Sequence, residues 1–177
     1  MNLYKYSFDE RFLFLTTKNS RADATYIRKQ LSIGESSIES RTLKLIPSEN
    51  SIRKSNIADF PAFFSYGLLL RQNTFDLIGS FLCDSGEFIK MEYKDETLYY
   101  LNTTKVIDVV NFDTTEFNVF EGYLTGIKKL YFHEELYDLP MIFKMKNLEN
   151  QPPLVSEKFV ELVSQYKLTG LKFYKIN

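Results

Sequence analysis

Apolar and polar residues alternate near the beginning of the chain, where single polar residues separate Tyr4, Tyr6 and Phe8. A period of two places the apolar side chains on one face of a β-strand, so a strand is predicted here. The apolar run at residues 12–17 predicts a second short strand after a turn, and residues 42–46 predict a third. Between residues 18 and 55 polar and charged side chains otherwise dominate, and we expect long loops or a short helix there.

A helical period appears after residue 65, and it predicts an amphipathic helix that ends at Gly86. Glycine closes helices because it adopts the left-handed conformation without steric cost. The expected apolar face consists of Leu70, Leu77, Ile78, Phe81 and Leu82.

A second amphipathic helix is expected after Ser156, which is a good N-cap, with Glu157 in the favourable first turn. Gly170 should end it and lead into a strand at residues 171–176. A shift of 84 residues superimposes the two helix–glycine–strand units, and Gly86 then falls on Gly170. The few identities are compatible with two units that pack alike and also with coincidence.

The remaining apolar segments are short and bounded by turn residues, which is typical of strands. Together the segments predict an α+β fold, mainly antiparallel sheet with two amphipathic helices, in a single compact domain at residues 1–177. Residues 1–55 form its least readable part. The additional strands are expected at residues 88–93, 98–102, 105–110, 127–132 and 141–145.

The composition indicates a folded protein and excludes several classes of function. Of 177 residues 44% are hydrophobic and 16% aromatic, which is too apolar and aromatic for a disordered chain. The formal net charge of −1 lacks the basic excess that direct nucleic-acid binding requires. No run of 18 apolar residues predicts a membrane span, and the charged first fifteen residues do not form a signal-peptide core. A single cysteine fits a reducing compartment, so we expect a cytoplasmic protein.

Candidate catalytic chemistry is sparse. His133 is the only histidine and Cys83 the only cysteine, so neither a disulfide framework nor a Cys/His metal site is expected. His133 is interpreted as a surface or structural residue, and Cys83 as a small buried hydrophobe at the end of a helix. No glycine-rich phosphate-binding motif is present. We therefore expect no catalytic residues, metal or cofactor, although a hydrolase that uses dispersed carboxylates remains an alternative.

An acidic and aromatic stretch is the best candidate for a binding surface. Residues 106–125 contain no Lys or Arg, and their Asp and Glu residues are interleaved with Phe and Tyr. Charge can steer a basic partner while aromatic side chains supply contact energy. The alternative is a strand end followed by a solvated loop. The candidate contact residues are Asp108, Asp113, Glu116 and Phe117.

Three segments in the C-terminal part of the chain are distinctive: DVVNFDTTEF at residues 108–117, PLVSEKF at 153–159 and TGLKF at 169–173. Through these segments the chain resembles a family of immunity proteins from bacterial polymorphic toxin systems, long described only as a domain of unknown function. The resemblance assigns an immunity-like core to residues 56–177.

This resemblance implies a small non-enzymatic protein that binds a cognate toxin in its own cell and neutralises it by occluding the active site. A basic nuclease domain is the kind of toxin that acidic contact residues would suit. The oligomeric state is left open, and a general protein-interaction scaffold without a toxin partner is a further alternative.

Overall fold

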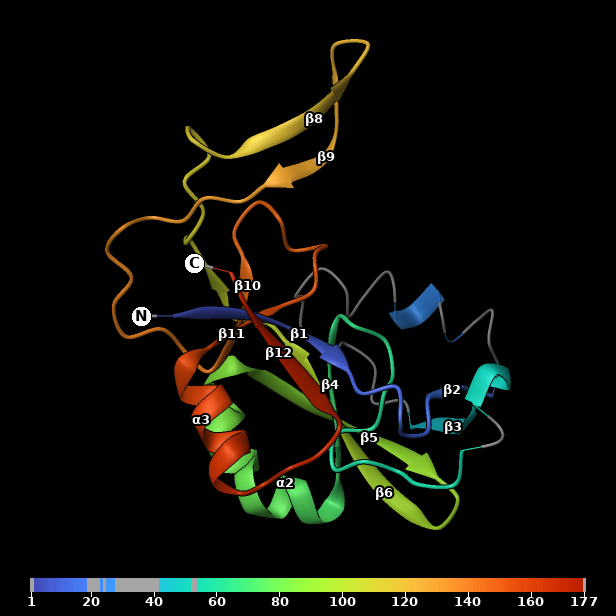
Figure 1. Ribbon diagram of the computed structural model, residues 1–177. Coiled ribbons are helices and arrows are strands. Elements are labelled where there is room, and N and C mark those ends of the chain that lie inside the picture. Colours follow the sequence, from blue (N-terminus) through green and yellow to red (C-terminus); the bar gives the residue numbers. More distant parts are fainter. Residues whose placement is uncertain (1, 19–22, 24, 28–41, 52–53, 177) are drawn as a thin grey trace.

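The computed structural model describes residues 2–18, 23, 25–27, 42–51 and 54–176 (Figure 1). The fold is α+β with mostly antiparallel sheets, as the sequence predicts. Most of the predicted loop region at residues 18–55 lies outside the described residues. The strands are β1 (Leu3–Phe8), β2 (Leu15–Thr17), β3 (Leu43–Pro47), β4 (Gly67–Arg71), β5 (Gly86–Tyr93), β6 (Glu96–Thr103), β7 (Val106–Ile107), β8 (Glu116–Phe120), β9 (Tyr123–Lys129), β10 (Ile142–Met145), β11 (Leu154–Ser156) and β12 (Leu171–Lys175). The helices include α2 (Gln72–Ile78), α3 (Glu157–Gln165) and the 3₁₀ segments η2 (Glu49–Ser51) and η3 (Gly79–Ser85).

The strands form two five-stranded sheets and one separate two-stranded sheet. The first has the order β12-β1-β11-β10-β7 and the second the order β2-β3-β5-β6-β4. Pairing is antiparallel except between β7 and β10 and between β3 and β5. Strands β8 and β9 form the third sheet, inserted in the chain between β7 and β10.

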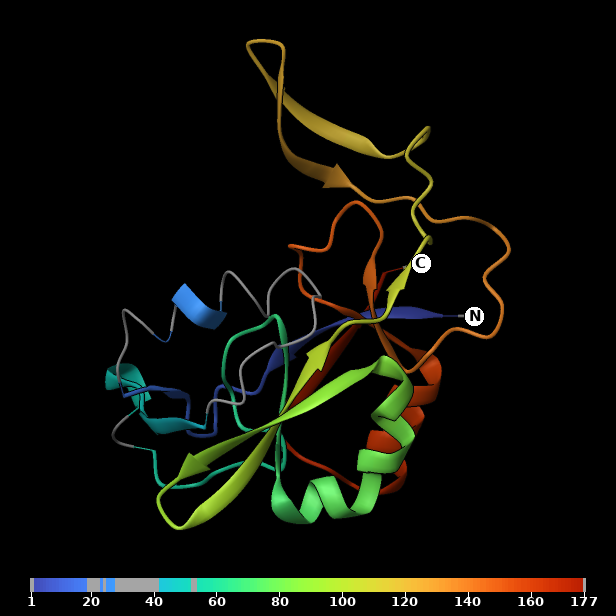
Figure 2. The same cartoon turned by 180° about the vertical axis from the view of Figure 1, so that it is seen from behind.

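Two strand–helix–strand units share one arrangement. In the second sheet β4 and β5 flank β6, and helix α2 with η3 connects them. In the first sheet β11 and β12 flank β1 in the same way, and α3 connects them. The two helices lie side by side in Figures 1 and 2. The similarity at an offset of 84 residues thus coincides with a repeated packing unit.

A single apolar cluster joins both large sheets and both helices. It contains buried residues of β4, β6, β10 and β11 together with Ile78, Leu82 and Phe159 from the helical segments. Further clusters cover the opposite faces of the two sheets. Strand β4 is buried on both faces, because Leu68 and Leu70 belong to the shared cluster while Leu69 belongs to the cluster on the opposite face of the second sheet. A strand buried on both faces is a continuous apolar run rather than an alternating one.

Several predicted elements are confirmed with shifted ends. The alternating segment at the beginning forms β1, residues 42–46 lie largely in β3, and β5 and β6 form a hairpin. The predicted strands at 141–145 and 171–176 are β10 and β12. Strand β2 forms as predicted, but it pairs with β3 and belongs to a different sheet from β1. The segment at 105–110 is a strand only at Val106–Ile107.

The first helix differs from its prediction. It begins only at Gln72, because Leu70 belongs to β4, and it continues as a 3₁₀ segment from Gly79. Leu77 and Phe81 are 43% and 50% exposed, so only part of the expected apolar face is buried. Gly86 has an extended backbone and begins β5 rather than closing a helix in the left-handed conformation. Its role is steric, because a Cβ there would overlap the backbone of Asn102.

Cys83 and Ser156 also depart from expectation. Cys83 lies in η3 with its side chain exposed, so its interpretation as a buried hydrophobe is wrong. Ser156 is the N-cap of α3, but its hydroxyl makes no capping hydrogen bond. Gly170 behaves as predicted, with φ of +107° before β12.

Candidate functional site

The β8–β9 hairpin projects from the rest of the molecule (Figures 1 and 2). Its strands pair from Glu116↔Lys129 to Phe120↔Tyr123, leaving a loop of two residues. Both loop residues have positive φ, 51° at Glu121 and 82° at Gly122. This pair of left-handed residues matches the twist of two antiparallel strands and closes the hairpin tightly. The hairpin therefore ends in a narrow, well-defined tip.

Hydrogen bonds anchor the hairpin at its base. The Asn111 side-chain oxygen accepts the backbone N–H groups of Asp113 and Thr114, at 3.1 and 3.3 Å. The Thr115 hydroxyl donates to the Asn111 carbonyl at 2.8 Å and accepts the Tyr131 N–H at 3.2 Å. These bonds connect the segment that enters β8 to the segment that leaves β9. An isolated two-stranded hairpin is marginally stable in water, so this connection contributes to its order.

Side-chain contacts reinforce the base. The rings of Phe112 and Phe117 stack with an interplanar angle of 6° and centres 6.4 Å apart. Glu116 forms an ion pair with Lys128 at 2.9 Å and accepts a hydrogen bond from the Tyr131 hydroxyl at 3.3 Å. The hydrogen bond and charge of Lys128 lower the pKa of the Glu116 carboxyl and keep it ionised. Phe112 also packs against the buried cluster beside the first sheet, which ties the base to the core.

The four predicted contact residues occupy this region in different states. Asp108 is half-exposed, and its carboxylate forms an ion pair with Lys146 at 2.9 Å. The Nε2 atom of the half-exposed His133 lies 3.9 Å from the same carboxylate. Asp113 is exposed in the turn before β8. Glu116 and Phe117 lie on β8 and are already engaged with other side chains of the hairpin base. Residues 106–125 contain no Lys or Arg, but Lys128 on the neighbouring strand β9 lies beside Glu116 and neutralises part of their negative charge.

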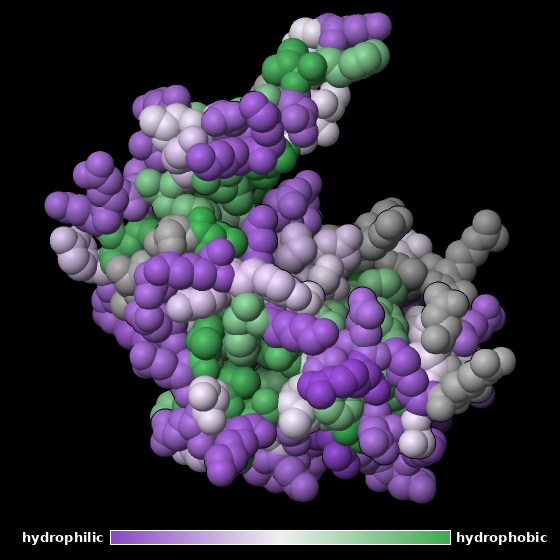
Figure 3. Space-filling view, in the orientation of Figure 1, coloured by the Kyte–Doolittle hydropathy of each residue, from purple (hydrophilic) through white to green (hydrophobic). Residues whose placement is uncertain are grey.

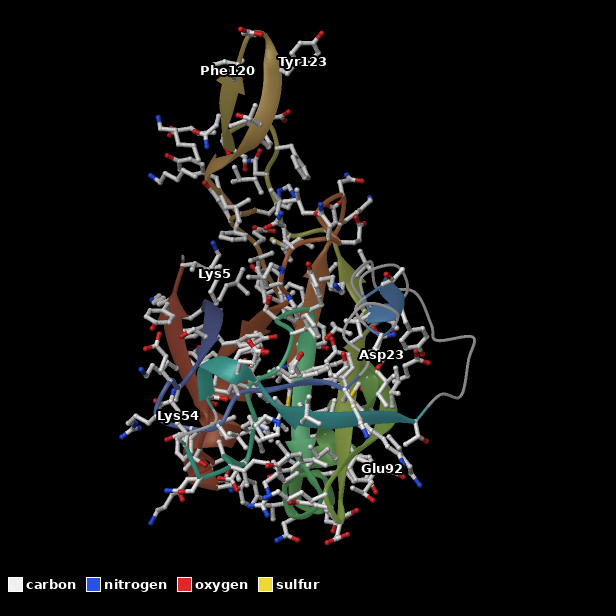
Figure 4. All side chains as sticks on the ribbon, turned by 90° about the vertical axis from the view of Figure 1, so that its right-hand side faces the viewer. Lys5, Asp23, Lys54, Glu92, Phe120 and Tyr123 are labelled. Carbon is white, nitrogen blue, oxygen red and sulfur yellow. The ribbon has the colours of Figure 1, made fainter. Side chains whose placement is uncertain are left out.

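The tip of the hairpin was not part of the predicted contact set. Its apolar side chains are strongly exposed, with Val119 at 63%, Phe120 at 66% and Tyr123 at 76%. Figure 3 shows apolar residues near the end of the hairpin, and Figure 4 places Phe120 and Tyr123 at its far end. A Glu-Gly loop between two aromatic residues could have indicated the turn, although it is a weaker hairpin pattern than Asn-Gly.

A pocket of about 490 Å³ lies where the base of the hairpin meets the first sheet. Ile127 and Lys128 of β9 line one side, and Lys5 and Tyr6 of β1 line another. Its described lining residues include no Asp, Glu, His or Cys. The pocket therefore offers cationic and apolar contacts without a carboxylate, imidazole or thiol.

A second pocket, of about 410 Å³, bears on the alternative of dispersed carboxylates because Asp9 and Glu10 line it. The Asp9 carboxylate accepts hydrogen bonds from the Arg11 guanidinium at 2.6 and 2.9 Å. These bonds hold the pKa of Asp9 well below its usual range. A carboxylate kept ionised in this way is suited to an ion pair and cannot donate a proton at neutral pH.

The described residues contain no group of three or more His, Cys, Asp or Glu side chains that could hold a metal ion. Within the same part of the chain, no helix is both long and apolar enough to span a membrane. The arrangement with the clearest potential for binding is the projecting hairpin.

Comparison with known proteins identifies the family of the chain. The model of the Imm11 immunity protein family matches residues 89–177, which include the hairpin, α3 and β12. The match spans half of the chain, and the chain belongs to this immunity protein family. The predicted resemblance is thus confirmed. A search of the curated proteins found no match.

Proposed function

We propose that the chain binds a cognate toxin protein and neutralises it by covering its active site. Membership of an immunity protein family is the observation that carries this proposal, because such proteins counteract toxins. Inhibition by occlusion requires a stable scaffold and a complementary surface, and it requires no catalytic group. The packed clusters supply the scaffold, and the projecting hairpin supplies a surface that extends beyond it.

The proposed contact region comprises the turn at residues 108–115 and the hairpin that follows, including Asp108, Asp113, Glu116 and Phe117. Glu116 and Asp108 already have lysine partners, so each adds little net charge toward a partner. Asp113 and Glu121 have no ion-pair partner among the described residues. Their carboxylates would steer a basic toxin surface, as a nuclease domain presents.

The same proposal includes the organisation and location of the protein. The apolar cluster shared by both large sheets supports one domain across residues 1–177. The exposed, unpaired Cys83 fits a reducing cytoplasm, where the toxin would be encountered. The partner is a protein, and direct binding to nucleic acid or membrane forms no part of the mechanism.

Co-expression with the neighbouring toxin tests this function. The active toxin alone should stop growth, and the toxin with this chain should permit it, with a catalytically inactive toxin as the growth control. The two proteins should also co-purify as a complex. Continued toxicity at full expression of this chain, together with separate elution of the two proteins, would refute the proposal.

A further inference from the structure

The tip of the hairpin combines apolar side chains that nothing in the described structure covers. Val119, Phe120 and Tyr123 fall within five residues, and each is more than 60% exposed. Among the described residues, the other exposed large hydrophobic side chains are less exposed, at 38–53% apart from Tyr137, and no three of them fall within five residues. A concentrated group of this kind marks an interaction site.

We propose that the tip, residues 119–123, is the anchor that enters an apolar cleft of the toxin, with Glu121 meeting a cationic group in that cleft. This inference rests on the proposed function and identifies the part of the surface that provides affinity. It differs from the predicted contact set, whose Glu116 and Phe117 lie at the base of the hairpin.

The tip has no role in holding the fold together. None of its residues belongs to the three apolar clusters of the body. The contacts that order the hairpin lie at the opposite end, where Thr115, Asn111 and Tyr131 are joined by hydrogen bonds. Burial of the tip by a partner would therefore add contact without disrupting existing packing.

The shape of the tip determines the kind of surface that can receive it. A two-stranded ribbon closed by the two residues Glu121 and Gly122 is narrow and convex, and Figure 4 shows Phe120 and Tyr123 diverging at its end. A flat surface would contact one of these rings at a time, whereas a cleft can surround both. Enzyme active sites are clefts of this kind, lined by apolar residues with a few polar groups.

The charge of the tip adds a second requirement. Glu121 is the residue at the turn, and residues 106–125 contain no Lys or Arg to neutralise it locally. Its carboxylate would lose hydration on entering a cleft, and a cationic partner must compensate for that loss. The expected receptor is therefore an apolar cleft with an Arg or Lys side chain, as found where an enzyme binds an anionic substrate.

The experiment measures affinity for the catalytic domain encoded by the neighbouring toxin gene, made inactive, by isothermal titration calorimetry. Phe120→Ser and Tyr123→Ser should each weaken binding by about 30-fold or more, as expected for aromatic anchors. Glu121→Gln should weaken it by about tenfold or more, with a reduced dependence on salt. Tyr137→Ser is the matched control, because Tyr137 is also 76% exposed but lies outside the hairpin.

Circular dichroism should show the wild-type fold in all four variants, since the substituted side chains lie outside the core. If the wild type binds while both aromatic variants retain affinity within threefold, the inference is wrong and the proposed function stands. If the wild type does not bind, both fail. A dimer in analytical ultracentrifugation that the tip substitutions dissociate, without any effect on toxin affinity, would assign the tip to a second copy and overturn the inference.

Discussion

Lys144 provides a quantitative test of how completely β10 is buried. It lies on β10, where all four residues are buried, and its side chain has no exposed surface. Its ammonium group donates a hydrogen bond to the Glu149 carbonyl at 2.8 Å. Burial lowers the pKa of Lys144 from 10.5 to about 8, against the opposing charge of Glu149.

The lowered pKa corresponds to a loss of stability at neutral pH. One pKa unit represents about 1.4 kcal/mol, so the protonated Lys144 costs about 3 kcal/mol relative to a lysine that stays hydrated. Replacement by Met keeps the shape but removes the charge and the hydrogen bonds of the ammonium group, each worth about 1 kcal/mol. The cost of burying the charge exceeds this loss, so Lys144→Met should stabilise the protein by about 1–2 kcal/mol at pH 7.

The sign of the pH dependence follows from proton binding. Between pH 8 and 10.5 the unfolded chain holds the Lys144 proton more often than the folded chain, so the wild type gains stability as pH rises. The advantage of Lys144→Met should consequently almost disappear by about pH 9.5. Urea unfolding followed by far-UV circular dichroism at pH 7 and pH 9.5 measures both values.

Lys90 on β5 is exposed and serves as the control. Lys90→Met should change the free energy of unfolding by less than about 0.5 kcal/mol at both pH values. The reasoning is refuted if Lys144→Met destabilises the protein at pH 7, or if its effect is the same at both pH values.

Three further predictions concern backbone conformation and charge. In urea unfolding, Gly170→Ala should lower the free energy of unfolding by about 3 kcal/mol or more, because φ is +107° and a Cβ would overlap the Phe60 backbone. Gly122 has φ of +82° but open space around it, so Gly122→Ala should cost only about 1 kcal/mol in the same experiment. The lowered pKa of Asp9 stabilises the fold fully above about pH 4, and this contribution decreases as pH falls toward the folded-state pKa of the carboxyl. Asp9→Asn should therefore be less stable than wild type at pH 7, and thermal unfolding should show a smaller but persisting difference at pH 2.5. Glu121→Asn should slow amide hydrogen exchange in the hairpin, because Asn tolerates the left-handed conformation better than Glu. The same substitution should weaken toxin binding, and faster exchange would contradict the prediction.

Sequence patterns predicted the elements whose local periodicity matches their burial. Strand β1 alternates because one face packs against the shared apolar cluster, and β12 follows a glycine that needs the left-handed conformation. Strand β4 was missed because its three consecutive leucines are buried on both faces, which removes the alternation. Leu70 was consequently assigned to the following helix.

The functional region was only partly predictable, because its charge and exposure depend on residues that come together only in the folded structure. The stretch at residues 106–125 drew attention through its composition, but β8 was not recognised because it has only five residues and Phe120 directly follows Val119, which breaks the alternation. Which carboxylates remain free depends on Lys128 and Lys146, which lie outside that stretch in the sequence and reach it only in the folded structure. Exposure of Phe120 and Tyr123 depends on how far the hairpin extends from the body, and no local pattern encodes that.

Titration of active toxin with this chain tests the central claim most directly. If the chain covers the active site, toxin turnover should fall linearly and vanish at one equivalent, and substrate at high concentration should slow formation of the complex. A purified one-to-one complex that retains the full catalytic rate of the free toxin would contradict the account.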